Sequence, residues 1–357
     1  MGLLSAALKS GAALAVLIAV VVGVVGKSCP ELFLKLPMGF IPWAMTGNPM
    51  PPFFVEDPLY AENFRKWAQD GDVIMATAAK SGTAWLQQIV HVLKTGNDTY
   101  PTTASPGQEG HPGMQYHGVG FMEAVSYPGQ TIDERVKQEQ PKRAHGKPMQ
   151  WFSHKAPGEK LYGLDVRANR GIKYIVCARN GKEVVRSFYP FLNGHTDEYR
   201  NLWGGFPPKM GSPEDALKFA TEDMPEFYFG YVKKWWPYRH EPNVLMLHYS
   251  DLKKDLKGSV QRIAKFLQLD SSSERIAITV ERASFAHMKA NGWKFLPRSG
   301  QRMEIKVLDV RVNEGESGGA VEFFTPDMTA KWEAVELKEF GSILGLKEWA
   351  ANGGPLP

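Results

Sequence analysis

The strongest structural signal in this sequence is a short apolar run that turns into a segment with helical spacing. Residues 73–76 (VIMA) are followed by a polar turn at 79–83 (AKSGT), and then by apolar residues at helical intervals over 85–93. A short apolar run before a glycine turn is typical of a buried strand, and the later spacing is typical of an amphipathic helix. The pattern predicts a strand, a loop and a helix in this order.

Two further apolar runs repeat this order. Residues 172–178 lead through 179–182 (RNGK) into a stretch with helical spacing, and residues 244–247 lead through 248–251 (HYSD) into apolar positions at 252 and 260–267. Strands that alternate with helices form parallel sheets covered on both faces. We therefore expect an α/β fold, a single P-loop-like domain over residues 61–350 whose central parallel β-sheet is flanked by helices on both faces. Residues 97–140 are rich in Gly, Pro and Ser and are expected to form a long loop over the mouth of the site.

Charge and cysteine content exclude several classes of function. The 42 Lys and Arg against 38 Asp and Glu give a net charge of +4, and no basic block with interleaved aromatics is present, which argues against a nucleic-acid partner. Two cysteines cannot build a disulfide scaffold, and Cys29 and Cys177 are too far apart for a Cys-x-x-Cys metal site. A small anionic ligand stays compatible with this composition.

The amino terminus carries a membrane signal. Residues 10–26 are uncharged and apolar between Lys9 and Lys27. This run is at the short end of the roughly 17 to 25 residues that span a bilayer, and longer than the roughly 7 to 15 of a signal-peptide core. Residues 1–27 are therefore read as a transmembrane anchor or a signal peptide, with the anchor favoured because residues 24–26 (VVG) fit a cleavage site only fairly. Residues 28–60 are read as a linker, and the protein is predicted to be single-pass, or secreted if the segment is cleaved.

The first loop has the chemistry of a phosphate site. Lys80 supplies a positive charge, Gly82 allows close approach of the backbone, and the hydroxyls of Ser81 and Thr83 can donate to phosphate oxygens at the start of a helix. The order differs from the Walker loop G-x-x-x-x-G-K-[ST], which disfavours hydrolysis of ATP or GTP. Taken alone, these residues fit an ordinary capped helix with a surface lysine equally well.

Several motifs together resemble one enzyme family. Residues 72–90 resemble the 5′-phosphosulfate loop of the cytosolic-type sulfotransferases (sulfotransferase family 1), usually T-Y-P-K-S-G-T-T-W. The family motif R-N-P-K-D-x-x-x-S, which binds a 3′-phosphate, is matched by residues 179–187 (RNGKEVVRS), and residues 152–157 (FSHKAP) resemble its K-T-H-L-P segment. Further similarity lies at 235–252, 284–288 (SFAHM) and 315–325, so the resemblance covers about residues 50 to 345.

This resemblance implies the co-substrate and its contacts. Members of the family use 3′-phosphoadenosine 5′-phosphosulfate (PAPS) as sulfuryl donor and need no metal. Carried over position by position, the PAPS-binding residues are Lys80, Ser81, Gly82, Thr83, Ala84, Trp85, Arg179, Ser187, Phe285, Arg311 and Gly315.

Three residues are expected to carry the reaction. Sulfuryl transfer builds negative charge on the phosphate that leaves, and Lys80 can stabilise it. An imidazole, with an ordinary pKa of about 6.5, suits a general base near neutral pH, and the resemblance gives this role to His154. Ser187 is implied to contact phosphate and to restrain the lysine when no acceptor is bound. The expected activity is in-line transfer of the sulfuryl group to a hydroxyl or amine of a small-molecule acceptor.

The sequence also departs from the family pattern. Ala84 replaces a threonine that touches the donor, Phe152 stands where the family has a lysine, and Asn313-Glu314 replaces an Arg-Lys pair, a role that Arg311 could take over. A weak or inactive homologue that binds adenosine bisphosphate is therefore the main alternative, and a P-loop kinase a less favoured one. The family's dimerisation segment is not recognisable, which leaves a homodimer open. Sulfotransferases of the Golgi have comparable anchors, so the Golgi or another secretory compartment is the expected location.

Overall fold

The computed structural model describes residues 68–99, 119–121, 150–158, 165–197, 200, 207, 209–295 and 320–357. The predicted membrane segment, the linker, Arg311 and Gly315 all lie outside these ranges. None of the helices in the described ranges has the length and apolar character that crossing a membrane requires.

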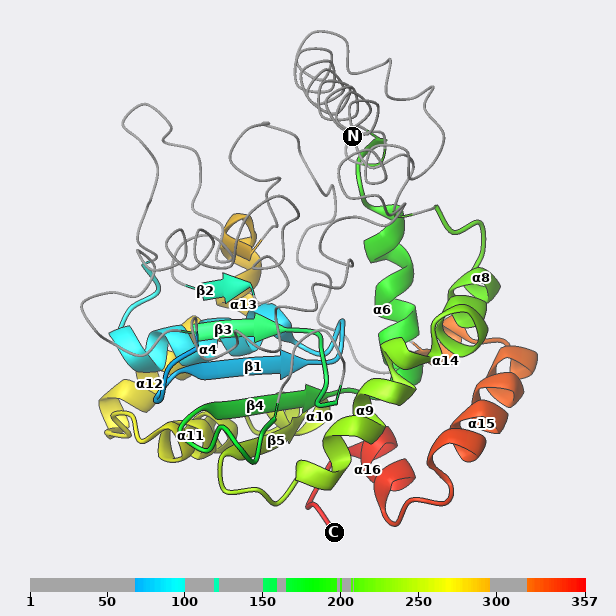
Figure 1. The fold of residues 1–357 in the computed structure, drawn as a ribbon. Coiled ribbons are helices and arrows are strands. Elements are labelled where there is room, and N and C mark those ends of the chain that lie inside the picture. The colour runs from blue at the N-terminus through cyan, green and yellow to red at the C-terminus, as the bar shows by residue number, and fades with distance from the viewer. Residues whose placement is uncertain are drawn as a thin grey trace, which may run out of the picture.

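The centre of the fold is a five-stranded sheet in which every neighbouring pair is parallel (Figure 1). Its strands lie in the order β2-β3-β1-β4-β5, with bounds β1 Val73–Thr77, β2 Val119–Phe121, β3 Gln150–Ser153, β4 Lys173–Ala178 and β5 Val244–His248. The predicted α/β class with a central parallel sheet is confirmed.

Both faces of the sheet are buried, which explains why the strands read as continuous apolar runs. Met75 and Ile175 face one cluster of buried side chains, which α4, α11 and α12 complete. Their neighbours in the two strands, Ile74 and Val176, face the other cluster, which lies under α6, α9, α15 and α16. The bounds are α4 Thr83–Thr95, α6 Gly181–Asn193, α9 Phe229–Trp235, α11 Leu256–Leu267, α12 Ser273–Arg282, α15 Pro326–Phe340 and α16 Leu346–Asn352.

Short helices connect these layers. They are α8 Pro213–Lys218, α10 Tyr249–Lys254, α13 Phe285–Ala290 and α14 Ala320–Phe323, with single turns at Phe219–Asp223, Pro225–Phe227, Trp236–Tyr238 and Gly292–Phe295.

Two segments differ from the prediction. The stretch expected to be a long loop contains the edge strand β2, whose three residues are too few to show a periodic pattern. The stretch after β5, expected to be a turn, forms helix α10, because the His248 side chain accepts a hydrogen bond from the backbone N–H of Ser250 and so caps a helix there.

Candidate active site

The register of the sheet brings the predicted site residues to one edge. Ala76 lies beside Ser153, Thr77 beside Cys177 and Ala178 beside His248. The residues that follow β3, β1, β4 and β5 therefore lie side by side, in this order, along the carboxyl edge of the sheet (Figure 1). They include His154, Lys80, Arg179 and Tyr249. Ligands of open α/β sheets bind outside this edge.

The loop between β1 and α4 presents an anion-binding surface. Lys80 and Gly82 both adopt left-handed backbone conformations, with φ of 61° and 94°. No side chain caps the start of α4, so the first N–H groups of this helix have no partner from a capping residue. The hydroxyl of Ser81 is buried and has no hydrogen-bond partner within the described residues, while Thr83 Oγ1 lies 2.6 Å from Thr77 Oγ1. A phosphate group would supply the missing partners.

Lys80 holds a charge in a place where charge is costly. Its Nζ lies 4.0 Å from the centroid of the Phe191 ring, on α6. Burial, and secondarily the positive charge of Arg179, lower the pKa of Lys80 from 10.5 to about 8. A desolvated ammonium group gains more from a bound anion than one in water does.

Arg179 connects the loop after β4 to its neighbours. Its Nη2 lies 3.1 Å from Glu183 Oε2, its Nη1 donates to the carbonyl of Lys80 at 3.3 Å, and its guanidinium carbon lies 4.5 Å from the Tyr249 ring centroid. Its buried Nε has no partner within the described residues. The guanidinium is thus fixed beside the phosphate loop, and its Nε–H group can still donate a hydrogen bond to a ligand.

Sequence reasoning did not single out Glu183 and Tyr249. Glu183 occupies the acidic position of the R-N-P-K-D motif, one helical turn after Arg179, and this spacing could have predicted the ion pair. Tyr249 is the first residue of α10, which follows β5, whereas Arg179 follows β4. The two residues are 70 positions apart in the sequence, so no local pattern links them.

Ser187 is half-buried on α6. It lies one helical turn after Glu183, which binds Arg179, and one turn before Phe191, which lies under the Lys80 ammonium group. This spacing places Ser187 on the helix face between the two cations.

His154 is exposed at the end of β3, and its Nδ1 lies 3.0 Å from the carbonyl oxygen of Thr77. Because a carbonyl only accepts, Nδ1 carries the hydrogen, and Nε2 carries the lone pair of the neutral ring. The bond fixes His154 to the strand that leads to Lys80. This tautomer is the one that a general base acting through Nε2 requires.

The two predicted aromatic contacts come from helices α4 and α13. The Trp85 indole N–H donates to the carbonyl of Ala283 at 2.8 Å, two residues before Phe285. Phe285, at the start of α13, is 43% exposed. Ala84, between Thr83 and Trp85, is half-buried and offers only a methyl group.

Replacing Gly82 by Ala should weaken the anion site. An added Cβ would lie 3.1 Å from Tyr249 Cδ2, at a backbone conformation that favours glycine. We expect a loss of about 1 kcal/mol of stability and, because Tyr249 supports Arg179, a rise of about tenfold in the KM of an anionic substrate. Gly354→Ala is the matched control, since Gly354 has φ of 92° but nothing within 4 Å of its Cβ position. Equal KM changes in both variants would contradict the role of close approach.

Comparison with known proteins decides the family. The profile of the sulfotransferase domain matches residues 70–342. The chain belongs to this family. Mouse (Mus musculus) sulfotransferase 1B1 is 28% identical over 281 residues, which cover 75% of this chain and 82% of that protein. Human (Homo sapiens) sulfotransferase 1E1 is 27% identical over 225 residues, which cover 63% and 68%.

Solved structures of similar proteins share the fold. Mouse sulfotransferase SULT7A1 complexed with PAP aligns with a TM-score of 0.55 at 19% identity, over 82% of this chain and 94% of that one. Retinol dehydratase in complex with androsterone and the inactive cofactor PAP aligns with a TM-score of 0.56 at 20% identity, over 82% and 86%.

Two departures of this sulfotransferase-family chain now have structural reasons. A Cβ at Gly181, the position of proline in the R-N-P-K motif, would lie 2.2 Å from Trp332 Cζ2 and 2.5 Å from Tyr228 Cε1, so these rings occupy the space of a proline side chain. Phe152 is buried in the cluster under α4, and its apolar side chain fits that core position.

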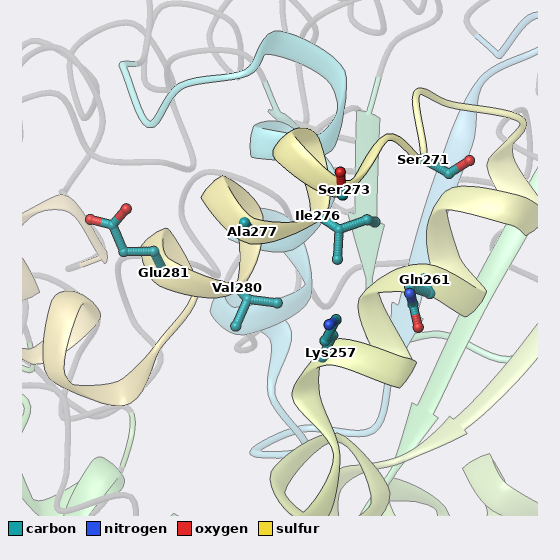
Figure 2. Close-up of a pocket in the computed structure, with 8 residues that line it drawn as sticks. All are labelled: Lys257, Gln261, Ser271, Ser273, Ile276, Ala277, Val280 and Glu281. Carbon is teal, nitrogen blue, oxygen red and sulfur yellow. The ribbon is translucent and has the colours of Figure 1, made fainter.

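Outside this edge, a groove of about 510 Å³ lies between α11 and α12. Figure 2 shows Lys257 and Gln261 on one side of it and Ile276 and Val280 on the other. None of the predicted site residues lines this groove. Among the described residues, no cluster of three His, Cys, Asp or Glu side chains could hold a metal ion.

Proposed function

We propose that this protein transfers the sulfuryl group of PAPS to a hydroxyl or amine of a small acceptor. The observation that carries this proposal is the placement of Lys80, Arg179 and His154 at the ends of three adjacent parallel strands, β1, β4 and β3. A catalytic cation, a phosphate-binding cation and a base at one edge are what this reaction needs.

The described residues fit PAPS, which carries a sulfated 5′-phosphate and a separate 3′-phosphate. The buried hydroxyl of Ser81 and the buried Nε of Arg179 belong to two adjacent loops, and neither donor has a partner among the described residues. Lys80, Ser81, Gly82, Thr83 and Ala84 would hold the 5′ end, Arg179 and Ser187 the 3′-phosphate, and Trp85 and Phe285 the adenine. PAP, which the two solved structures hold, is what remains of PAPS after transfer, and this supports PAPS as the donor.

Each of the predicted catalytic residues would have a separate role in the reaction. Bound PAPS supplies a sulfuryl group on a phosphate that can leave. The Lys80 ammonium stabilises the negative charge that grows on the phosphate oxygen. His154, with its Nδ1–H donated to Thr77 O, accepts the acceptor's proton at Nε2. Ser187, on α6 between the residues that contact Arg179 and Lys80, is assigned to the phosphates.

Mass spectrometry of acceptors tests the function. The full chain is incubated with PAPS and a panel of phenols, alcohols and amines. We expect an acceptor to gain one sulfuryl group while one PAP forms. Binding of PAP without any modified acceptor would instead favour an inactive homologue, and transfer of a phosphoryl group from ATP would favour a kinase.

We also propose that residues 1–27 anchor the protein in a secretory membrane with the catalytic domain in the lumen. Asn97-Asp98-Thr99 is an acceptor motif for N-glycosylation, and Asn97 is exposed just after α4. Expressed in mammalian cells, the full chain should show a glycosidase-sensitive mass shift that Asn97→Gln removes and Thr99→Ser retains. An unshifted wild-type protein would place the domain outside the lumen.

A further inference from the structure

One face of α9 is lined by three buried side chains with polar ends. Tyr228 immediately precedes the helix, Tyr231 lies one turn later and Trp235 is the last helical residue, so spacings of three and four place them on the same face. Their exposed fractions are 1%, 2% and 0%. Buried hydroxyl and indole groups need hydrogen-bond partners, so their partners show which segments this face of the helix fixes in place.

All three donate to main-chain carbonyls at the carboxyl edge of the sheet. Tyr228 Oη donates to the carbonyl of Arg179 at 2.9 Å, and Tyr231 Oη donates to that of Ala76 at 2.6 Å. Trp235 Nε1 donates to the carbonyl of Lys155 at 3.2 Å. These carbonyls belong to the segments at the ends of β4, β1 and β3. The same segments carry Arg179, Lys80 and His154.

The helix itself is firmly held. The Phe229 ring lies 4.8 Å from that of Trp332 and 5.2 Å from that of Phe340, both on α15. The Tyr228 ring lies 5.6 Å from Trp332. In Figure 1, α9 lies beside the arrowheads of β1 and β4. A helix packed on α15 is thus bonded to the next-to-last residue of β1 and to the first residues of the loops after β4 and β3.

We propose that Tyr228, Tyr231 and Trp235, the α9 donor face, are positioning residues that set the relative placement of the three loops. A hydrogen bond to a carbonyl fixes the plane of its peptide and hence the direction of the adjoining side chains. Because each donor reaches a different strand end, each has a different effect on the site. The inference rests on the proposed function, in which Arg179 binds the 3′-phosphate and the β1 loop binds the 5′ end.

Binding of two nucleotides separates these effects. PAP carries 3′- and 5′-phosphates, whereas adenosine 5′-monophosphate (AMP) has no 3′-phosphate, so the ratio of the Kd of AMP to the Kd of PAP reports on the 3′-phosphate subsite alone. Tyr228→Phe removes only the hydroxyl that holds Arg179. We expect this ratio to fall about five- to tenfold in Tyr228→Phe, through a higher Kd for PAP.

Tyr231→Phe is the matched comparison, because it loses an equally buried hydroxyl from the same helix face. Both Kd values should rise by a similar factor, so that the ratio changes by no more than about twofold. Tyr238→Phe, on the single turn after α9, controls for loss of a phenol and should change neither Kd. A generally loosened fold would affect Tyr228→Phe and Tyr231→Phe alike, which separates positioning from stability.

Trp235 adds a kinetic test. Trp235→Phe releases the segment after His154, and we expect kcat to fall about tenfold while the Kd of PAP stays within about twofold of wild type. If this variant does not fold, the two tyrosine variants still decide the question.

The outcomes distinguish the two proposals. A wild-type protein that binds PAP no better than AMP would overturn the assignment of Arg179 to a 3′-phosphate, and with it the proposed function. A wild type that prefers PAP, together with a Tyr228→Phe variant whose ratio is unchanged, would overturn the positioning role alone.

Discussion

Replacement of His154 by Ala is expected to lower kcat by about 10²- to 10⁴-fold, the range in which loss of a general base falls. His154 is exposed, and its ring meets the core only edge-on at Phe152, with ring centroids 6.3 Å apart, so the fold should be little affected. The Kd of PAP should stay within about twofold of wild type, because His154 acts on the acceptor side. Single-turnover kinetics with saturating donor measure the chemical step directly.

Asparagine at this position provides the decisive comparison. Its side-chain amide can donate to the carbonyl of Thr77 as Nδ1 of His154 does, but it has no basic nitrogen. His154→Asn should therefore be as slow as His154→Ala if His154 is the base. Recovery of activity in His154→Asn would show that His154 only holds the strand ends together. His240→Ala, a change of an exposed histidine that precedes β5, should leave the rate unchanged.

The strands and the phosphate loop could be predicted because their signals are local. Burial on both faces gives β1 and β4 unbroken apolar runs, and Gly82 marks the tight turn by its residue type alone. The sequence brings Lys80 and Arg179 together only through the resemblance, which assigns both to PAPS; the parallel sheet explains why the loops after β1 and β4 lie at the same edge.

Contacts between distant segments could not be predicted in this way. The bond from Tyr231 to Ala76 joins residues 155 positions apart, and that from Trp235 to Lys155 joins residues 80 apart. From sequence alone, a tyrosine or tryptophan on a helix is interpreted as a core-packing residue, and Trp235 would be interpreted in this way. Phe191 likewise reads as one apolar residue of α6, although it lies under the Lys80 ammonium group. Only the tertiary fold shows which aromatic side chains also position polar groups.

Lys80→Met should be the other nearly inactive variant, with kcat lower by about 10²- to 10³-fold. The substitution keeps most of the side-chain volume but removes the charge that stabilises the leaving phosphate. Unlike His154→Ala, it should also raise the Kd of PAP, because the same ammonium group binds the ground-state phosphate. Isothermal titration with PAP and turnover with PAPS separate the two effects. A Lys80→Met protein with wild-type kcat would remove Lys80 from the mechanism.

The pH dependence of donor capture gives an independent test of the same residue. Burial lowers the pKa of Lys80 to about 8, so its charge is lost in the donor-free protein as pH rises through this value. The kcat/KM for PAPS should then fall about tenfold for each further pH unit. Lys80→Arg keeps its charge throughout this range, so its lower activity should show no such alkaline limb. A limb that persists in Lys80→Arg would have to come from another group.

The same pKa predicts that Lys80 costs the protein stability. Its folded-state pKa of about 8 lies below the unfolded value of 10.5, so the unfolded chain binds the proton more tightly. The penalty is fully present below pH 8 and is relieved as pH rises from 8 towards 10.5. At pH 7, Lys80→Met should therefore stabilise the donor-free protein, by about 1 to 2 kcal/mol once the lost contact with Phe191 is deducted. This gain should shrink at pH 10, as urea unfolding at both pH values would show. A Lys80→Met variant that is less stable than wild type at pH 7 would contradict this prediction. It would mean that groups of the protein already stabilise the ammonium charge without a bound phosphate.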